Sequence, residues 1–333
     1  MVPHMIAADI AILLLLTVLI IVTFALRLRA IGVSIVQQEK DKLKTWGVKI
    51  DPDCETDLSP YVCGQLLSDP GGAPDPNRPR SAEVDTDAAT YAVRIIGKFI
   101  AGGVVGSSPS VLQLRGMGPA VLTYSAQDPQ PMAATWVAAD GASAVVAVRG
   151  TRTAADVISD LQVLEVGTEL PDDPAGGGTP PISVHKGIYD VYNSVSALLS
   201  AAIPSTVKSI FIAGHSMGAA IAFYYALDAA RAGLKVEVWG IAPPRAGNRA
   251  FADELARSTR ATAVINLADV VPTLPWSYMP GAPNEYATIA PAAVFNNLKS
   301  DITSCHTLPA YYEGVVAGPV MVPALAAGSG AAP

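Results

Sequence analysis

The pentapeptide Gly-His-Ser-Met-Gly at residues 214–218 constrains the fold of this chain more than any other feature of its sequence. The apolar run before it, residues 208–213, is typical of a buried strand, and residues 219–228 after it are typical of a helix. A Gly-x-Ser-x-Gly motif between a strand and a helix indicates a sharp turn that lifts the serine clear of a sheet. Gly214 and Gly218 carry no side chain that would clash in this turn. We therefore interpret Ser216 as a nucleophile; the alternative is an ordinary Gly/Ser turn.

A serine hydroxyl becomes a strong nucleophile only when a base accepts its proton and an acid orients that base. In sheets with this motif the chain order is Ser, then Asp or Glu, then His. Of the four histidines, only His306 follows Ser216. Asp269 comes directly after the strand-like run 261–267, at a strand end where α/β sheets carry functional groups. The sequence therefore predicts that Ser216, Asp269 and His306 form a catalytic triad.

Other histidines and acids fit these roles less well. His185 precedes a predicted helix and is interpreted as a loop residue that forms hydrogen bonds. His215 belongs to the elbow and is interpreted as a structural residue that points away from the reactive face of its neighbour. The competing acids, which fall mostly within predicted helices and strands or close to His306 in sequence, are Asp228, Glu237, Asp253, Glu254, Glu285 and Asp301.

Backbone N–H groups should stabilise the oxyanion that forms when a serine attacks a carbonyl group. One is expected from Met217, the residue after the nucleophile. The second is expected from Thr151, because the strand-like run 142–149 ends at Gly150 and Thr151. The alternative is an ordinary strand-end turn, since Arg-Gly-Thr alone is a weak motif.

Several blocks, in order across residues 120–312, together resemble the class 3 lipases, the fungal-type triacylglycerol lipase family of the α/β-hydrolase superfamily. The blocks are Arg149-Gly-Thr151, Asp156-Val-Ile-Ser-Asp-Leu161, Val184-His-Lys-Gly-Ile188, Gly214-His-Ser-Met-Gly218, Pro244-Arg-Ala-Gly-Asn248 and Asn266-Leu-Ala-Asp-Val-Val-Pro272. The resemblance implies an α/β-hydrolase fold, with a mostly parallel central sheet flanked by helices. It also implies hydrolysis of lipid esters, acylglycerols or phospholipids, without a metal or organic cofactor.

Residues 152–161 stand where secreted members of that family carry a lid helix. Val157, Ile158 and Leu161 fall at helical spacing, and Val157 stands where those lids often carry a tryptophan. These three side chains would cover an acyl pocket or pack as part of a structural helix, and the sequence leaves both interpretations open.

Composition excludes some functions and leaves others open. A net charge of −7 argues against nucleic-acid binding. The sequence has neither a glycine-rich phosphate motif nor clustered metal-ligand spacing. A small-ester esterase, a thioesterase and a catalytically silent binding protein with the same fold remain alternatives to a lipid hydrolase. Protein partners and oligomeric state leave no signal.

An N-terminal run, residues 10–26, contains 17 residues without a charge, which is the short limit for a membrane-spanning helix. Arg27 and Arg29 follow the run, and neither lysine nor arginine precedes it, unlike a cleaved signal peptide. We therefore predict an uncleaved membrane anchor. Basic residues after the run favour a cytosolic catalytic domain. A disulfide between Cys54 and Cys63 would instead indicate an oxidising compartment, and free thiols are the alternative.

These features divide the chain into four predicted parts. They are a transmembrane anchor at 1–29, a juxtamembrane segment with a Pro/Gly-rich linker at 30–82, an α/β-hydrolase domain at 83–314 and a disordered Ala/Gly/Pro tail at 315–333. Within the third part, helices are expected at 84–101, 187–203 and 217–232, antiparallel strands at 121–125 and 133–138, and a strand at 234–240.

Overall fold

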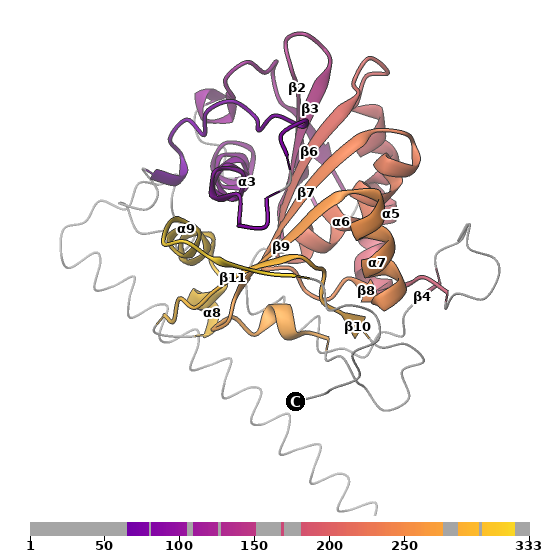
Figure 1. Cartoon of the computed structure of the whole chain (residues 1–333). Coiled ribbons are helices and arrows are strands. Elements are labelled where there is room, and N and C mark those ends of the chain that lie inside the picture. Colours follow the sequence, from indigo (N-terminus) through magenta and orange to yellow (C-terminus); the bar gives the residue numbers. More distant parts are fainter. Residues whose placement is uncertain are drawn as a thin grey trace, which may run out of the picture. The chain divides into compact units, whose positions relative to one another are not determined.

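The computed structural model describes residues 65–79, 81–104, 109–125, 128–150, 168–169, 181–275, 286–299 and 302–323 (Figure 1). All of them belong to one of the two compact units of the chain, Pro52–Pro333; the other unit is Met1–Asp51. The predicted membrane span, Cys54 and Cys63 lie outside the described residues, so the anchor stays a prediction. Within the described stretches, no helix is long and apolar enough to cross a membrane.

A central sheet of eight strands has the order β1-β2-β3-β6-β7-β9-β11-β12. The strands are β1 (Val121–Tyr124), β2 (Pro131–Val137), β3 (Ser143–Val148), β6 (Ser209–His215), β7 (Lys235–Ile241), β9 (Arg260–Asn266), β11 (Ala292–Phe295) and β12 (Val320–Val322). The inner strands β3, β6, β7, β9 and β11 are parallel, and β1, β2 and β12 pair antiparallel at the two edges. This arrangement confirms the predicted, mostly parallel sheet.

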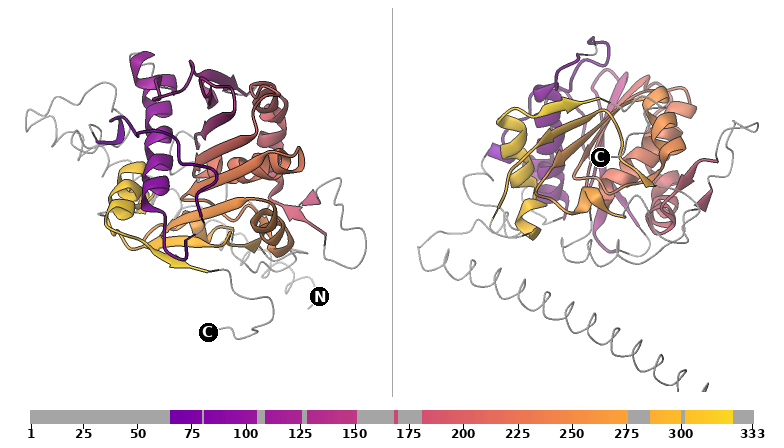
Figure 2. Two further views of the ribbon diagram at one scale, coloured as in Figure 1. Left: turned by 45° about the horizontal axis from the view of Figure 1, so that its top comes forward. Right: turned by 60° about the horizontal axis from the view of Figure 1, so that its bottom comes forward.

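Helices cover both faces of this sheet, which explains why its inner strands are apolar throughout. In β6, Ile210 and Ile212 belong to the core on one face, and Phe211 and Ala213 belong to the core on the other. Figures 1 and 2 show the two helix layers on opposite faces of the sheet. One layer contains α5 (Lys186–Ala201), α6 (Met217–Arg231) and α7 (Arg249–Ser258), and the other contains α3 (Thr86–Phe99) and α9 (Leu308–Val316).

Most of these helices begin at a side chain that accepts a hydrogen bond from the first turn. Asp85 caps α3, His185 caps α5, Asn248 caps α7 and Thr307 caps α9. The helix α6 follows Ser216 directly and has no side-chain cap. Its first N–H groups have no acceptor within the helix, and the serine side chain is not used to satisfy them.

A second, smaller sheet has the order β10-β8-β5-β4. Its strands, two residues each, are β4 (Thr168–Glu169), β5 (Ser183–Val184), β8 (Gly247–Asn248) and β10 (Tyr286–Ala287). A Cβ atom on Gly247 would lie 2.5 Å from the carbonyl oxygen of Ser183, so the pairing requires glycine there. This sheet could not be predicted from the sequence, because two residues are too few to show an alternating pattern.

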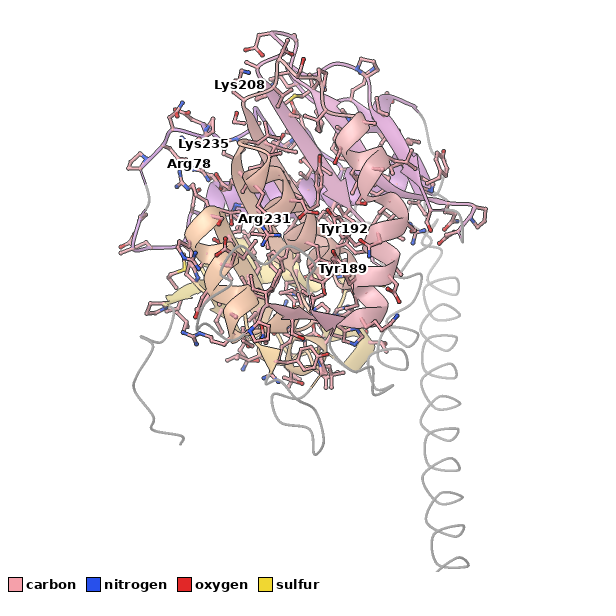
Figure 3. All side chains as sticks on the ribbon, turned by 90° about the vertical axis from the view of Figure 1, so that its right-hand side faces the viewer. Arg78, Tyr189, Tyr192, Lys208, Arg231 and Lys235 are labelled. Atoms are coloured by element: carbon pink, nitrogen blue, oxygen red, sulfur yellow. The ribbon has the colours of Figure 1, made fainter. Side chains whose placement is uncertain are left out.

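The folded region begins before residue 83, which corrects the predicted domain boundary. Residues 65–79, predicted as part of a linker, pack on the domain. Leu66 is fully buried, and the Arg78 guanidinium contacts both carboxylate oxygens of Glu237 at the start of β7. Arg78 also donates to Asp85 over 2.5 Å, and Lys235 donates to Asn77 over 2.7 Å. Figure 3 shows Arg78 and Lys235 on the same side of the domain. Composition suggested a linker because it does not show contacts with residues that are distant in sequence, such as Glu237 and Lys235 of β7.

The C-terminal boundary also needs correction. The predicted tail begins at residue 315, yet α9 continues to Val316 and β12 (Val320–Val322) pairs with β11 along one edge of the central sheet. Val315 is fully buried. Residues 324–333 lie outside the part of the chain that the structure describes.

Candidate active site

The turn between β6 and α6 holds Ser216 in strained backbone. Its φ is 58° and its ψ is −133°, and a positive φ is uncommon for a residue other than glycine. A Cβ atom on Gly214 would lie 2.2 Å from the carbonyl oxygen of Gly218, and one on Gly218 would lie 2.2 Å from that of Arg149. Close backbone packing therefore explains why the sequence has glycine on both sides of the serine.

The structure brings Ser216, Asp269 and His306 into one hydrogen-bonded row. The distance from His306 Nε2 to Ser216 Oγ is 2.8 Å, and that from His306 Nδ1 to Asp269 Oδ2 is 2.7 Å. All three residues are buried. Because a carboxylate only accepts, Nδ1 carries the proton, and the lone pair of Nε2 accepts the serine hydroxyl. This geometry lets the imidazole take the serine proton.

Three donors hold the carboxylate of Asp269. Its Oδ1 accepts the Val271 N–H over 3.0 Å, and its Oδ2 accepts the Tyr311 hydroxyl over 2.7 Å in addition to His306. Burial, followed by the nearby charge of Asp269, holds the pKa of the Tyr311 hydroxyl well above its usual value. The hydroxyl therefore stays protonated and donates. Sequence reasoning missed Tyr311, because nothing in the sequence distinguishes it from the adjacent Tyr312.

Asn266, at the end of β9, ties the acid and the base to the sheet. Its side-chain amide donates to the carbonyl oxygens of Asn297 (2.9 Å) and Cys305 (3.1 Å), and its Oδ1 accepts the Asn297 N–H over 2.8 Å. Its own backbone N–H donates to the Tyr311 hydroxyl over 3.2 Å. Cys305 directly precedes His306, so this fully buried amide holds the loop that carries the base.

His215 lies against His306, a contact with the base that the expectation of a structural residue turned away from the reactive face of Ser216 did not include. Its Nε2 donates to the carbonyl oxygen of His306 over 2.9 Å, and the two ring centroids are 4.9 Å apart. Burial of the ring, reinforced by His306, lowers the pKa of His215 to about 3. The side chain is therefore neutral at neutral pH and adds no positive charge beside the base. The contact could not be predicted from the sequence, because His306 lies 91 positions from His215.

The predicted oxyanion donors are only partly within the described structure. Met217 is the first residue of α6, where its N–H has no acceptor inside the helix. Thr151 and the predicted lid residues Val157, Ile158 and Leu161 lie outside the described residues. Gly150, just before Thr151, packs against the nucleophile: a Cβ atom on it would lie 2.8 Å from that of Ser216.

The competing acids that the structure describes are engaged elsewhere. Glu237 binds Arg78, and Asp228 of α6 accepts the hydroxyl of Tyr192 on α5. Asp253 and Glu254 lie on α7 and pair with arginines of the same helix. Across the described ranges, no cluster of three or more His, Cys, Asp or Glu side chains could hold a metal ion.

Comparisons with known proteins point to one family. A model of the family described as lipase (class 3) matches residues 145–279. A phospholipase A1-II 3 of Oryza sativa subsp. japonica is 29% identical over 201 residues, which cover 50% of this chain and 44% of that protein. A phospholipase A1 EG1, chloroplastic/mitochondrial, of Oryza sativa subsp. indica is 32% identical over 164 residues, which cover 40% and 36%. The chain thus spans less than half the length of these relatives.

Solved structures show the same fold. A non-glycosylated LIP2 lipase of Yarrowia lipolytica aligns with a TM-score of 0.52 at 16% identity, and the alignment covers 72% of this chain and 86% of that one. The family model spans β3, the elbow at Ser216 and Asp269, which are the segments that carried the resemblance in the sequence. Residues 145–279 are thus similar to the class 3 lipases, and the chain has the fold of the solved lipase structures.

Proposed function

We propose that this chain is a serine hydrolase that cleaves carboxylic ester bonds of lipids. The observation that carries the proposal is the buried row of hydrogen bonds that joins Ser216, His306 and Asp269. The match of residues 145–279 to the class 3 lipase family supports ester hydrolysis. The phospholipase A1 names of the rice relatives support phospholipids as substrates beside acylglycerols.

The first half of the reaction forms an acyl-enzyme. Ser216 Oγ bonds to the ester carbonyl carbon while its proton moves to His306 Nε2 and the carbonyl π electrons move onto oxygen. When the C=O bond forms again, the bond to the alcohol oxygen breaks, and His306 gives its proton to that oxygen. Asp269 keeps the imidazole oriented and stabilises its positive charge during the transfer.

The second half releases the fatty acid. A water molecule loses a proton to His306 and bonds to the acyl carbon, again placing an electron pair on the carbonyl oxygen. Collapse of this intermediate breaks the bond to Oγ and returns the proton to Ser216. In both halves, the N–H groups of Met217 and Thr151 are the proposed donors to the oxyanion.

We also propose that residues 10–26 anchor the enzyme in a membrane. The uncharged run followed by Arg27 and Arg29 supports this proposal. An anchor would keep the catalytic domain close to lipid substrates. The proposal predicts that the chain sediments with membranes after carbonate washing and that a chain lacking residues 1–29 does not.

The nucleophile is tested by labelling with a fluorophosphonate probe. The native chain should be labelled, and Ser216→Ala should not. Ser194→Ala is a matched control, because Ser194 is a partly buried serine on α5 that binds Ser125 and the Val191 carbonyl. This variant should be labelled like the native chain.

The substrate is tested by incubating native and Ser216→Ala protein with a mixed lipid extract and measuring released acyl chains by mass spectrometry. Release by the native chain alone supports a lipid hydrolase. Labelling together with hydrolysis of short-chain esters or thioesters only would identify a different esterase. A native chain that is neither labelled nor active would be a silent binding protein.

A further inference from the structure

The backbone on both sides of the proposed base, His306, is held by two side chains of the central sheet. The side-chain amide of Asn266 donates to the carbonyl oxygen of Cys305 over 3.1 Å. His215 Nε2 lies 2.9 Å from the carbonyl oxygen of His306 itself, and because a carbonyl group only accepts, this nitrogen carries the proton. The two carbonyl groups belong to the two peptide units that meet at the Cα atom of His306.

Holding these two peptide units fixes the direction in which the imidazole leaves the chain. Each peptide unit is planar, so the backbone at one residue turns only about the two bonds to its Cα atom. Two backbone bonds from the segment's own turn, α8 (Ile302–Cys305), also reach the N–H groups of His306 and Thr307. These bonds shape the turn, whereas the side chains of Asn266 and His215 tie it to the sheet.

Each of the two side chains stands at the end of a strand that leads to another triad residue. His215 is the last residue of β6 and directly precedes Ser216. Asn266 is the last residue of β9 and precedes Asp269 by three positions. The base is therefore held against the same two strand ends that carry the nucleophile and the acid.

The ring of His215 can hold the base without repelling it. The ring centroids of His215 and His306 are 4.9 Å apart, and the ring planes are inclined by 36°. Burial, reinforced by His306, lowers the pKa of His215 to about 3, so its ring is neutral at neutral pH. It therefore donates its Nε2–H to the backbone and adds no charge beside the imidazolium that forms on His306 during the reaction.

We propose that His215 and Asn266 act together as positioning residues for the base. Their two bonds fix the backbone of His306 so that the imidazole stays within 2.8 Å of Ser216 Oγ and 2.7 Å of Asp269 Oδ2. This inference rests on the proposed hydrolase function. It assigns the histidine of the Gly-His-Ser-Met-Gly motif a role in the rate of the reaction, beyond the shape of the elbow.

The first test separates the donor of His215 from the rest of its side chain. His215→Leu removes the donor, and His215→Gln keeps an N–H donor on a side chain of similar reach. His215→Met, which also has no donor, replaces the leucine variant if that variant does not fold. His185→Leu is the matched control, because His185 also stands at the start of a helix and caps α5.

Each full-length variant is assayed for melting temperature, for kcat and KM with a chromogenic ester, and for the low-field proton NMR signal of His306 Nδ1–H, which reports its bond to Asp269. Since small misplacements of a catalytic group cost up to about a hundredfold in rate, kcat of His215→Leu should fall roughly tenfold to a hundredfold, with little change in KM. The NMR signal should broaden in this variant. His215→Gln should keep the signal and recover kcat to within about fivefold of the native value. His185→Leu should lose melting temperature and keep both kcat and the signal.

The second test asks whether the two side chains act on one backbone conformation. Asn266→Ala should lower kcat by a factor similar to that of His215→Leu, and the double variant should lose less than the product of the two factors. Asn248→Ala is the matched control, because this buried amide donates to the Pro181 carbonyl over 2.8 Å and accepts the Phe251 N–H over 3.0 Å. It should lose melting temperature and keep kcat.

Several results would overturn the inference. One is a native kcat and an unchanged NMR signal in folded His215→Leu. Equal kcat losses in the leucine and glutamine variants of His215, or in His215→Leu and His185→Leu, would show that the donor is not what matters. Failure of both the leucine and methionine variants to fold would assign His215 a purely structural role. Factors that simply multiply in the double variant, or an Asn266→Ala chain that does not fold, would remove the joint action with Asn266. An inactive native chain would overturn the proposed function itself and is thus distinguishable from these outcomes.

Discussion

Removing the hydroxyl of Tyr311 should lower the free energy of unfolding several times more than removing that of its neighbour Tyr312. Tyr311 is fully buried on α9 and donates to Asp269 over 2.7 Å while accepting the Asn266 N–H over 3.2 Å. Tyr312 is almost as buried, but its hydroxyl accepts from Arg94 over 3.0 Å and donates to Gln65 over 3.2 Å. Neither partner belongs to the triad. Replacing each tyrosine by phenylalanine removes one oxygen atom and leaves the ring.

The expected cost of Tyr311→Phe follows from these contacts. A hydrogen bond to a charged group contributes about 1.5–3 kcal/mol, and a buried donor left without a partner, here the Asn266 N–H, costs about 1–3 kcal/mol more. Part of the second cost is recovered by relaxation, so we expect a total loss of about 2–4 kcal/mol in the free energy of unfolding. Tyr312→Phe loses bonds near the surface and should cost about 1 kcal/mol.

The assay is denaturant unfolding of both variants and the native chain, with kcat measured on the same preparations. Asp269 keeps His306 and the Val271 N–H as donors in Tyr311→Phe, so the triad should persist with a less firmly held acid. We expect a kcat about tenfold lower, since small misplacements of catalytic groups cost one to two orders of magnitude. Equal stability and equal kcat in the two variants would refute the argument that Tyr311 supports the acid.

The remaining predictions concern acid sensitivity and the N-terminal segment. His215 has a folded-state pKa of about 3, below its unfolded value, so it binds a proton more readily when unfolded, and stability is lost as pH falls from about 6.5 toward 3. Because the residue keeps some solvent exposure, it accounts for at most about 3 kcal/mol of the free energy of unfolding that is lost between pH 7.5 and 4.5. In His215→Gln, the free energy of unfolding should therefore fall less over this pH range, by up to that amount. Glu237→Gln should weaken the hold of Arg78, so that limited proteolysis cuts residues 65–79 faster while kcat stays unchanged.

The residues that carry the proposed chemistry could be predicted because strand ends meet in a parallel sheet. Ser216 follows β6, Asp269 follows β9, and chain order left only His306 as the base. The motif around Ser216 also fixes its own turn through glycine packing. Local sequence is therefore enough to identify these three residues, although their contact spans 90 positions between serine and histidine.

The residues that support the site could not be predicted in this way. The side chain of Asn266 binds carbonyl groups 31 and 39 positions away, and Tyr311 binds a carboxylate 42 positions away. Each is an ordinary residue type for its element, and only the fold shows what it contacts. The strands of the smaller sheet escaped prediction for a related reason, since two residues pair through long-range contacts that no local pattern encodes.

The contacts of Tyr311 and Asn266 change how the C-terminal part of the chain should be understood. Composition favoured a tail from residue 315, yet α9 carries the hydroxyl that holds Asp269, and β12 covers the strand next to β9. The nucleophile needs no such help, because backbone packing at Gly214 and Gly218 fixes its turn. Loss of C-terminal packing should therefore disturb the acid and the base first and leave the serine in place. Residues 302–323 are in this sense part of the proposed catalytic centre rather than an appendage to it.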